Sequence, residues 1–188
     1  DVRNQQEVQN AINSLPKEWK NIDVLVNNAG NAHGLEPISE ANISDWDAMM
    51  DGNVKGLLYV SQPIIKLMKA NNSGHIVNIS SVAARQTYAN GTVYCASKKA
   101  VDVISEGMRL ELTEFGIKVT NVQPGAVETD FSKVRFKGDE ERAATVYAGY
   151  EPLIAEDIAD AISYCVNAPE RVSIAEICIY PKAQAEPR

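Results

Sequence analysis

Four apolar runs, separated by stretches of helical pattern, constrain the fold of this chain more than any other feature. Asn-Asn, Ser-Ser or proline stops each run soon after its last apolar residue. Such runs are typical of strands buried on both faces of a parallel sheet. Helical spacing of apolar residues covers 44–70, 97–115 and 155–167. The runs are IDVLV at 22–26, HIVNI at 75–79, IKVTNV at 117–122 and EICIY at 176–180.

This alternation of strands and helices predicts an α/β fold, a three-layer, doubly wound parallel sheet with helices on both faces. Ser44 is the expected N-cap of the long helix, and Pro63 predicts a bend inside it. Gly116 is expected to end the following long helix in the left-handed conformation. A short helix is expected over 4–15, and 130–155 has no clear pattern. No linker or repeat divides residues 1–188, so we expect a single domain.

Composition excludes several classes of function. The net charge is −7, which gives no basic surface for nucleic acid or an anionic membrane, and no apolar run is long enough to span a bilayer. The first residues do not resemble a signal peptide, so a cytoplasmic protein is expected. Three scattered cysteines and two histidines lack metal-ligand spacing, so we expect no metal site and buried, reduced thiols.

One expected feature is missing from the sequence. A doubly wound sheet that binds a dinucleotide opens with a strand, a glycine-rich turn and a helix, and no G-x-G-x-x-G or related cluster occurs here. We therefore expect a fold without its first βαβ portion, represented by an incomplete chain of a longer protein. A protein that truly began at Asp1 would bind a dinucleotide weakly and show little activity.

Tyr94 and Lys98 stand four residues apart in VYCASKKA, so one helix face carries both. An ammonium beside a phenol favours the phenolate and lowers the pKa of Tyr94 from about 10 toward neutral, where general acid–base catalysis is efficient. Ser81 follows a strand and is placed to orient a carbonyl oxygen. Alone, the pair is more typical of a surface helix, and Ser80-Ser81 of a polar strand exit.

The ends of three expected strands point to the same place in the fold. Open α/β sheets bind ligands beyond the carboxyl ends of their strands, and Tyr94 opens the helix that follows one of these ends. Alone, the segment that ends at Gly30 could be a turn with positive φ at that glycine, and Pro124-Gly125 could simply end a strand. Together they predict one crevice. The segments are Asn27-Asn28-Ala29-Gly30, Ser80-Ser81 and Pro124-Gly125.

Five motifs in this order resemble the short-chain dehydrogenase/reductase family over essentially the whole chain. They are VNNAG, N-x-x-G in DGNVKG, IVNISS, Y-C-A-S-K and QPGAVETD. Ser81 lies thirteen residues before Tyr94, which is the spacing found in the family. Ser81, and not Ser80, therefore matches the family's catalytic serine. LPKEWKNIDVLVNNAG, FSKVRFKGD and ICIYPKAQA resemble its NADP-dependent serine and 3-hydroxy acid dehydrogenases. The resemblance implies a Rossmann-type fold and NADP. NAD stays open, because the strand end that selects between them is absent.

The resemblance also implies roles for individual residues. Tyr94 would take the alcohol proton, Lys98 would hold the nicotinamide ribose and lower the Tyr94 pKa, and Ser81 would bind the substrate oxygen. Asn53 would position a proton-relaying water. Asp1 and Val2 would contact adenine. The other cofactor contacts implied, besides Tyr94 and Lys98, are Asn28, Ala29, Gly30, Pro124, Gly125, Val127, Thr129 and Ser132.

The substrate expected from the subgroup is L-serine, L-allo-threonine or a small 3-hydroxy acid, with malonic semialdehyde reduced in the reverse direction. Its carboxylate needs a cation, and Arg135 is the first candidate and Arg85 the second. A surface role for either arginine stays open. So do a family reductase for another carbonyl, such as a 3-oxoacyl thioester or ketosteroid, and a non-catalytic cofactor-binding or structural relative.

The two long helices that begin near Ser44 and Tyr94 carry more apolar residues than one buried face needs. Family resemblance implies that they pair across a dimer within a homotetramer, a dimer of dimers. The expected partners are thus a small hydroxy acid or its carbonyl form and further copies of the chain, with no nucleic acid and no membrane.

Overall fold

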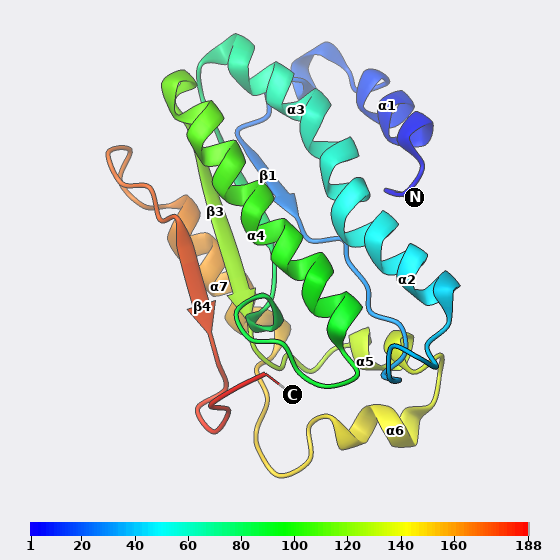
Figure 1. Cartoon of the computed structure of the whole chain (residues 1–188). Helices are drawn as coiled ribbons and strands as arrows, with labels where there is room; N and C mark the ends of the chain where they lie inside the picture. Colours follow the sequence, from blue (N-terminus) through cyan, green and yellow to red (C-terminus); the bar gives the residue numbers. More distant parts are fainter. Residues whose placement is uncertain (188) are drawn as a thin grey trace.

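The computed structural model describes residues 1–187, and within them the four apolar runs form one parallel sheet. The strands lie side by side in the order of the sequence (Figure 1). Across the sheet, Val26 aligns with Val77 and Val77 with Thr120, so the carboxyl ends meet at one edge. The strands are β1 (Val24–Asn27), β2 (Gly74–Ile79), β3 (Ile117–Pro124) and β4 (Glu176–Ile179).

Helices cover both faces of the sheet, which confirms the three-layer α/β prediction (Figure 1). On one face, α3 (Leu57–Asn71) and α4 (Thr92–Leu112) pack on Ile76 and Val119, and α1 (Gln5–Asn13) lies against α3. On the other face, α7 (Ala155–Val166) packs on alternate strand residues, including Val77 and Val122. Side chains of neighbouring strand residues thus enter opposite layers.

The first strand does not match the prediction of burial on both faces. Val24 is 36% exposed and Val26 41% exposed, whereas Leu25 packs into the core beneath α3 and α4. β1 is the edge strand of the sheet, and α7 covers β2, β3 and β4 rather than β1. A continuous apolar run therefore indicates the strand here but not the burial of both its faces.

The long helical stretch begins two residues before the expected Ser44 cap. Asn42 is the N-cap, because its side-chain oxygen accepts a hydrogen bond from the N–H of Ser44 at 3.0 Å. The stretch continues through α2 (Ile43–Met50), a π-helical segment, η2 (Asp51–Gly56), and α3. The departure from α-helical geometry thus precedes Pro63, which lies within α3. Single π-helical turns inside helices frequently occur at functional sites.

The remaining elements are short. The 3₁₀ turns are η1 (Lys17–Trp19), η3 (Val82–Ala84) and η4 (Thr113–Phe115). After η4, Gly116 adopts φ of 66°, which confirms the left-handed residue expected beyond α4. The stretch 130–155 was expected to have no clear pattern, but it contains α5 (Phe131–Arg135) and α6 (Glu140–Thr145), both too short to give a helical period.

Three further observations concern membrane-spanning helices, metal ligands and cysteines. Within residues 1–187, no helix combines the length and the apolar character that crossing a membrane requires. Over the same residues, no group of three or more His, Cys, Asp or Glu side chains is arranged to hold a metal ion. Cys95 and Cys165 are buried free thiols as expected, but Cys178 is exposed because it lies in the edge strand β4.

Candidate active site

A cavity of about 460 Å³ opens at the carboxyl edge of the sheet. The ends of β1, β2 and β3 form its floor, and α4 and α7 form its sides. The predicted convergence of segments distant in the sequence is therefore correct. The predicted residues that line this cavity are Asn28, Gly30, Ser81, Tyr94, Lys98, Pro124, Gly125, Val127 and Thr129.

Tyr94 and Ser81 lie together at the centre of the site. Tyr94 is in the first turn of α4, is 9% exposed, and packs edge-on against Phe131 with ring centroids 5.8 Å apart. Burial raises the pKa of Tyr94 above its ordinary value, and the hydrogen bond with Ser81 opposes this rise. The expectation of a lowered pKa is therefore wrong, because burial outweighs the effect of the neighbouring groups.

Lys98 lies one turn beyond Tyr94 and is also buried, with 5% of its surface exposed. Its Nζ donates a hydrogen bond to the carbonyl oxygen of Ile79 at 3.0 Å and lies 6.0 Å from the centroid of the Tyr94 ring. Burial lowers the pKa of Lys98 to about 8, and the charge of Asp102 opposes this decrease. The ammonium is therefore held close to Tyr94 without direct contact to its hydroxyl.

Asn53 is fixed beside this pair by the π-helical segment η2. It is 2% exposed; its Oδ1 accepts from the N–H of Asn31 at 2.7 Å, and its Nδ2 donates to Ser97 Oγ at 3.0 Å. A Cβ atom on Gly30 would lie 3.1 Å from Asn53 Oδ1 and 3.3 Å from Lys98 Nζ. The absence of a side chain at Gly30 thus keeps open the space in front of these polar groups.

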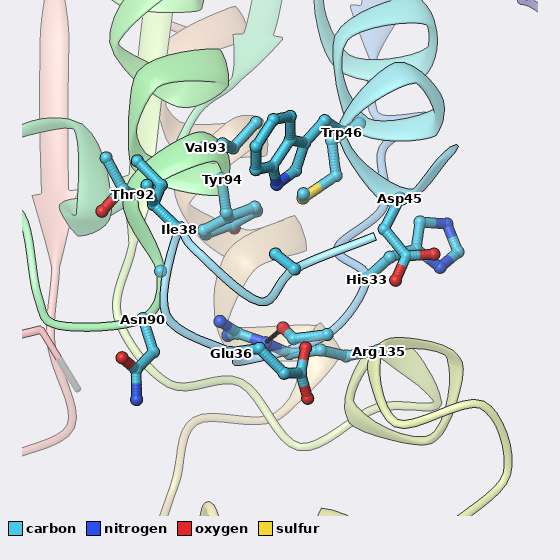
Figure 2. A pocket seen from close by; sticks show the side chains of 14 residues that line it. His33, Glu36, Ile38, Asp45, Trp46, Asn90, Thr92, Val93, Tyr94 and Arg135 are labelled. Atoms are coloured by element: carbon cyan, nitrogen blue, oxygen red, sulfur yellow. Dashed lines mark hydrogen bonds between the residues drawn. The ribbon is translucent and has the colours of Figure 1, made fainter. Parts of the chain in front are cut away.

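A second, smaller cavity of about 90 Å³ shares Ser81 and Tyr94 with the first. Arg135 lines this cavity, is 8% exposed, and has its Cζ atom 5.6 Å from the centroid of the Tyr94 ring. Arg135 also lines a neighbouring pocket, which Figure 2 shows with Arg135 below Tyr94 and with Glu36 and Asp45 in its lining. A buried cation therefore lies next to the hydroxyl groups of the site.

Only part of the Arg135 guanidinium is engaged by the protein. Nε donates to the carbonyl oxygen of Gly34 at 3.1 Å, and Nη1 donates to the Tyr88 hydroxyl at 3.1 Å. Nη2 has no hydrogen-bond partner within residues 1–187 although it is buried. Because an unpaired buried N–H group is costly, this atom is available for an anionic ligand.

Arg85, the second candidate, lies elsewhere. Its side chain is 51% exposed, donates to Gln123 Oε1 at 3.0 Å and lies 3.7 Å from Glu176. It lines neither of the two cavities at the site. The geometry therefore favours Arg135 over Arg85 as the residue that could bind a carboxylate.

The remaining residues predicted to contact the cofactor do not line the larger cavity. Asp1 binds the Arg3 side chain at 2.6 Å, and Val2 packs against Gly56, so both lie in the N-terminal segment beside η2. Ala29 is exposed, next to Asn28 and Gly30 in the loop after β1.

Ser132, also expected to contact the cofactor, lies on the wall of the smaller cavity, where its hydroxyl is 2.8 Å from that of Tyr147. The contacts of these residues with a cofactor stay predictions.

Sequence reasoning missed three side chains that shape the smaller cavity. Tyr88 binds Arg135, Tyr147 donates a hydrogen bond to the carbonyl oxygen of Val127 at 3.0 Å, and Gln184 accepts one from the N–H of Ala126 at 2.8 Å. Gln184 is 7% exposed although it lies in the C-terminal tail. A buried polar tail residue has no pattern in sequence that would distinguish it.

The fold and this site together define an α/β oxidoreductase of the nucleotide-binding type. A family model described as short chain dehydrogenase matches residues 1–140, and the chain belongs to this family. It is 42% identical to the NADP-dependent 3-hydroxy acid dehydrogenase YdfG of Salmonella typhi over 186 residues, which are 98% of this chain and 75% of that protein. An NADP-dependent 3-hydroxy acid dehydrogenase of Schizosaccharomyces pombe is 39% identical over 98% of this chain and 71% of its own length.

Solved structures agree with this assignment. The closed form of a serine dehydrogenase complexed with NADP+ superimposes with a TM-score of 0.96 at 41% identity, covering 98% of this chain and 75% of that one. Serine dehydrogenase from Escherichia coli gives a TM-score of 0.85 at 36% identity with the same coverage. The chain is thus an NAD(P)-dependent oxidoreductase, as its motifs predicted.

The residues present fit the nicotinamide–ribose end of a dinucleotide, although the sequence carries no glycine-rich turn for the pyrophosphate. The larger cavity is long enough to pass from Asn28 and Gly30 to Thr129, and Gly30 leaves the approach to Lys98 unobstructed. The buried ammonium of Lys98 faces this cavity, where it can donate hydrogen bonds to ribose hydroxyls. The smaller cavity also reaches Tyr94, together with Arg135.

Proposed function

We propose that the protein is an NADP-dependent dehydrogenase of small 3-hydroxy acids, including serine and allo-threonine, which reduces malonic semialdehyde in the reverse direction. The observation that carries this proposal is Arg135, a buried guanidinium with an unpaired Nη2 on the wall of a small cavity that also holds Tyr94 and Ser81. The names of the relatives support NADP and hydroxy acids.

Each side chain has a distinct part in this reaction. Ser81 donates a hydrogen bond to the substrate oxygen, and Tyr94 takes the hydroxyl proton during oxidation. When bound, oxidised NADP would supply the acceptor for the hydride that leaves the same carbon. Lys98, while protonated, favours the phenolate form of Tyr94. Asn53 positions the water that relays protons beside Lys98. Arg135 binds the carboxylate through Nη2 and thereby places the hydroxyl carbon beside Tyr94.

The lining of the smaller cavity bears on the choice among substrates. Of the described residues that line it, none is aspartate or glutamate, so an ammonium group on the substrate would lack a counter-ion there. We therefore expect 3-hydroxypropionate to have a higher kcat/KM than L-serine. Equal values for the two, measured at pH 7.5 with saturating NADP, would contradict this expectation.

Arg135→Met tests the carboxylate contact. Truncation of one member of a charge-assisted hydrogen bond costs about 2–4 kcal/mol, so we expect KM for 3-hydroxypropionate to rise about 30-fold or more. KM for an uncharged short alcohol should change little. Arg85→Met is the matched control, because it removes the same charge outside both cavities. An unchanged ratio of the two KM values would overturn the assignment of Arg135.

Two alternatives are tested with the same protein. The volume of the smaller cavity, about 90 Å³, disfavours a 3-oxoacyl thioester or a ketosteroid as the substrate. A panel of these compounds and small 3-hydroxy acids decides which class is turned over. A non-catalytic relative would show no turnover with any member. Tyr94→Phe should lower kcat by about 10²–10⁴-fold, and undiminished turnover in this variant would contradict the mechanism.

We also propose that the protein forms a homo-oligomer through α4, in keeping with the family. Val103 and Leu110 project from this helix, 60% and 77% exposed, and Leu58 on α3 is 41% exposed. Large apolar side chains gathered on long helices favour burial against another surface. A cytoplasmic location and a dimer of dimers stay predictions from the sequence.

A further inference from the structure

Asp102 lies on α4 one turn beyond Lys98, and its side chain is only 11% exposed. Three donors converge on its carboxylate: Ser80 Oγ at 2.7 Å, Asn121 Nδ2 at 2.7 Å and Gln123 Nε2 at 3.1 Å. Ser80 directly follows Ile79, the last residue of β2, and the other two lie on β3. A buried carboxylate is costly to desolvate, and here three donors from β3 and the residue after β2 offset that cost.

The same contacts connect Asp102 to Lys98. Ser80 Oγ lies 3.0 Å from the carbonyl oxygen of Lys98, and Lys98 Nζ donates to the carbonyl oxygen of Ile79, the residue before Ser80. The end of β2 is therefore held on one side by the lysine ammonium and on the other by the aspartate carboxylate. Residues four apart on a helix lie on one face, so the two charges lie near each other.

Other charged and titratable groups also face Asp102. Lys99 Nζ, from α4, lies 3.8 Å away but is 61% exposed, and its charge is screened by solvent. Cys178, from β4, interacts electrostatically with Asp102. Arg85 reaches the cluster only through Gln123 and is itself close to Glu176. Tyr94 flanks Lys98 on its other side. Of these, Lys98 is the buried cation.

We propose that Asp102 is a positioning residue for Lys98: its fixed negative charge keeps the lysine protonated at neutral pH, and its hydrogen bonds hold the lysine-bearing turn of α4 on the end of β2. Burial alone would favour the neutral amine, which neither donates three hydrogen bonds nor favours a phenolate. The role in activity rests on the function proposed above, whereas the effect on Lys98 does not.

A direct titration of Lys98 tests this role. The protein is labelled with ¹³C at the lysine Cε atoms, and the Lys98 resonance is assigned by its loss in Lys98→Arg. Asp102→Asn and Asp102→Ser remove the charge, and two variants are used so that the test stands even when one of them does not fold. We expect the pKa of Lys98 to fall by about one unit or more in both, whereas Asp102→Glu should restore it to within half a unit of the wild-type value.

Glu111→Gln is the matched control, since it removes one negative charge from an exposed position on the same helix. An unchanged Lys98 titration in a folded neutral variant overturns the proposal, because a carboxylate that merely fastens α4 to the sheet would not set the charge of Lys98. The alkaline limb of the kcat profile should move to lower pH by the same amount. Absence of hydroxy acid turnover, together with a shifted titration, would contradict the proposed function and leave the role of Asp102 supported.

Discussion

Burial moves the two ionisable groups of the site toward their neutral forms. The pKa of Tyr94 is raised and that of Lys98 is lowered to about 8, in each case chiefly because the side chain is removed from water. The protein therefore holds a charged lysine at a cost in stability. Such a cost is typical of residues kept for chemistry rather than for packing.

Lys98→Met should reveal this cost as a dependence of stability on pH. The ordinary pKa of 10.5 applies to the unfolded chain and about 8 to the folded one, so the penalty is fully present below pH 8 and is relieved as pH rises toward 10.5. The stability advantage of Lys98→Met over wild type should shrink by about 2 kcal/mol between pH 7.5 and 9.5. Urea unfolding at the two pH values measures this, and a constant difference would show that Lys98 is not perturbed.

Several site residues were predicted from sequence because each carries a local signal. Spacing to Tyr94 selected Ser81, and the structure shows Ser81 in both cavities and Ser80 bound to Asp102. Tyr88 and Gln184 gave no such signal. Their partners lie 47 and 58 residues away, so their roles arise only from tertiary contacts.

At the scale of elements, the four strands were predictable because their apolar runs are bounded by polar or turn residues. The exposed face of β1 was not, because burial depends on which helix lies over the strand. The helices α5 and α6 were missed, although α5 carries Arg135. Their short length gives no periodicity, so contacts with the rest of the fold decide their conformation.

Two glycines on adjoining elements give a matched test of the turn after α4. Gly116 has φ of 66°, and a Cβ there would lie 3.0 Å from the carbonyl oxygen of Asn72. Gly116→Ala should lower the free energy of unfolding by about 1–2 kcal/mol. Gly107→Ala, inside α4, has no atom of its own chain within 4 Å of an added Cβ, and in a monomeric background such as Leu110→Glu it should raise the free energy of unfolding by up to about 1 kcal/mol. Chemical denaturation of both variants measures whether the two changes in the free energy of unfolding have opposite signs. A Gly116→Ala variant with unchanged stability would argue against the left-handed turn.

At the scale of the whole molecule, the loop before α2 and the segment around α6 are joined over the site. Glu36 pairs with Arg142 at 3.3 Å and Asp45 with Lys137 at 2.9 Å. Both pairs flank Arg135, whose carbonyl oxygen accepts the N–H of Gly34 at 2.9 Å. Exposed pairs of this kind contribute little individually, so the backbone contact is the firmer link.

The exposed apolar side chains of α4 belong to the same scale. Val103 is 60% exposed and lies seven residues before Leu110 on one side of the helix. If this side is the interface between copies, Leu110→Glu should shift the molar mass in solution toward the monomer, because it places a charge in an apolar contact. Light scattering after gel filtration measures this, with Leu110→Met as control. A mass that Leu110→Glu leaves unchanged would place the interface elsewhere.

The π-helical segment Asp51–Gly56 has a consequence for insertions and deletions in the gene. A π-helical turn accommodates one residue more than an α-helix of the same length, so loss of a single codon within 51–56 would allow a regular helix from Ile43 to Asn71. The helices on either side would keep their relative orientation, but the wide turn that carries Asn53 would close, and Asn53 could no longer reach both Asn31 and Ser97. At this position the chain can lose a codon and keep its helix, but it would lose the geometry of the site.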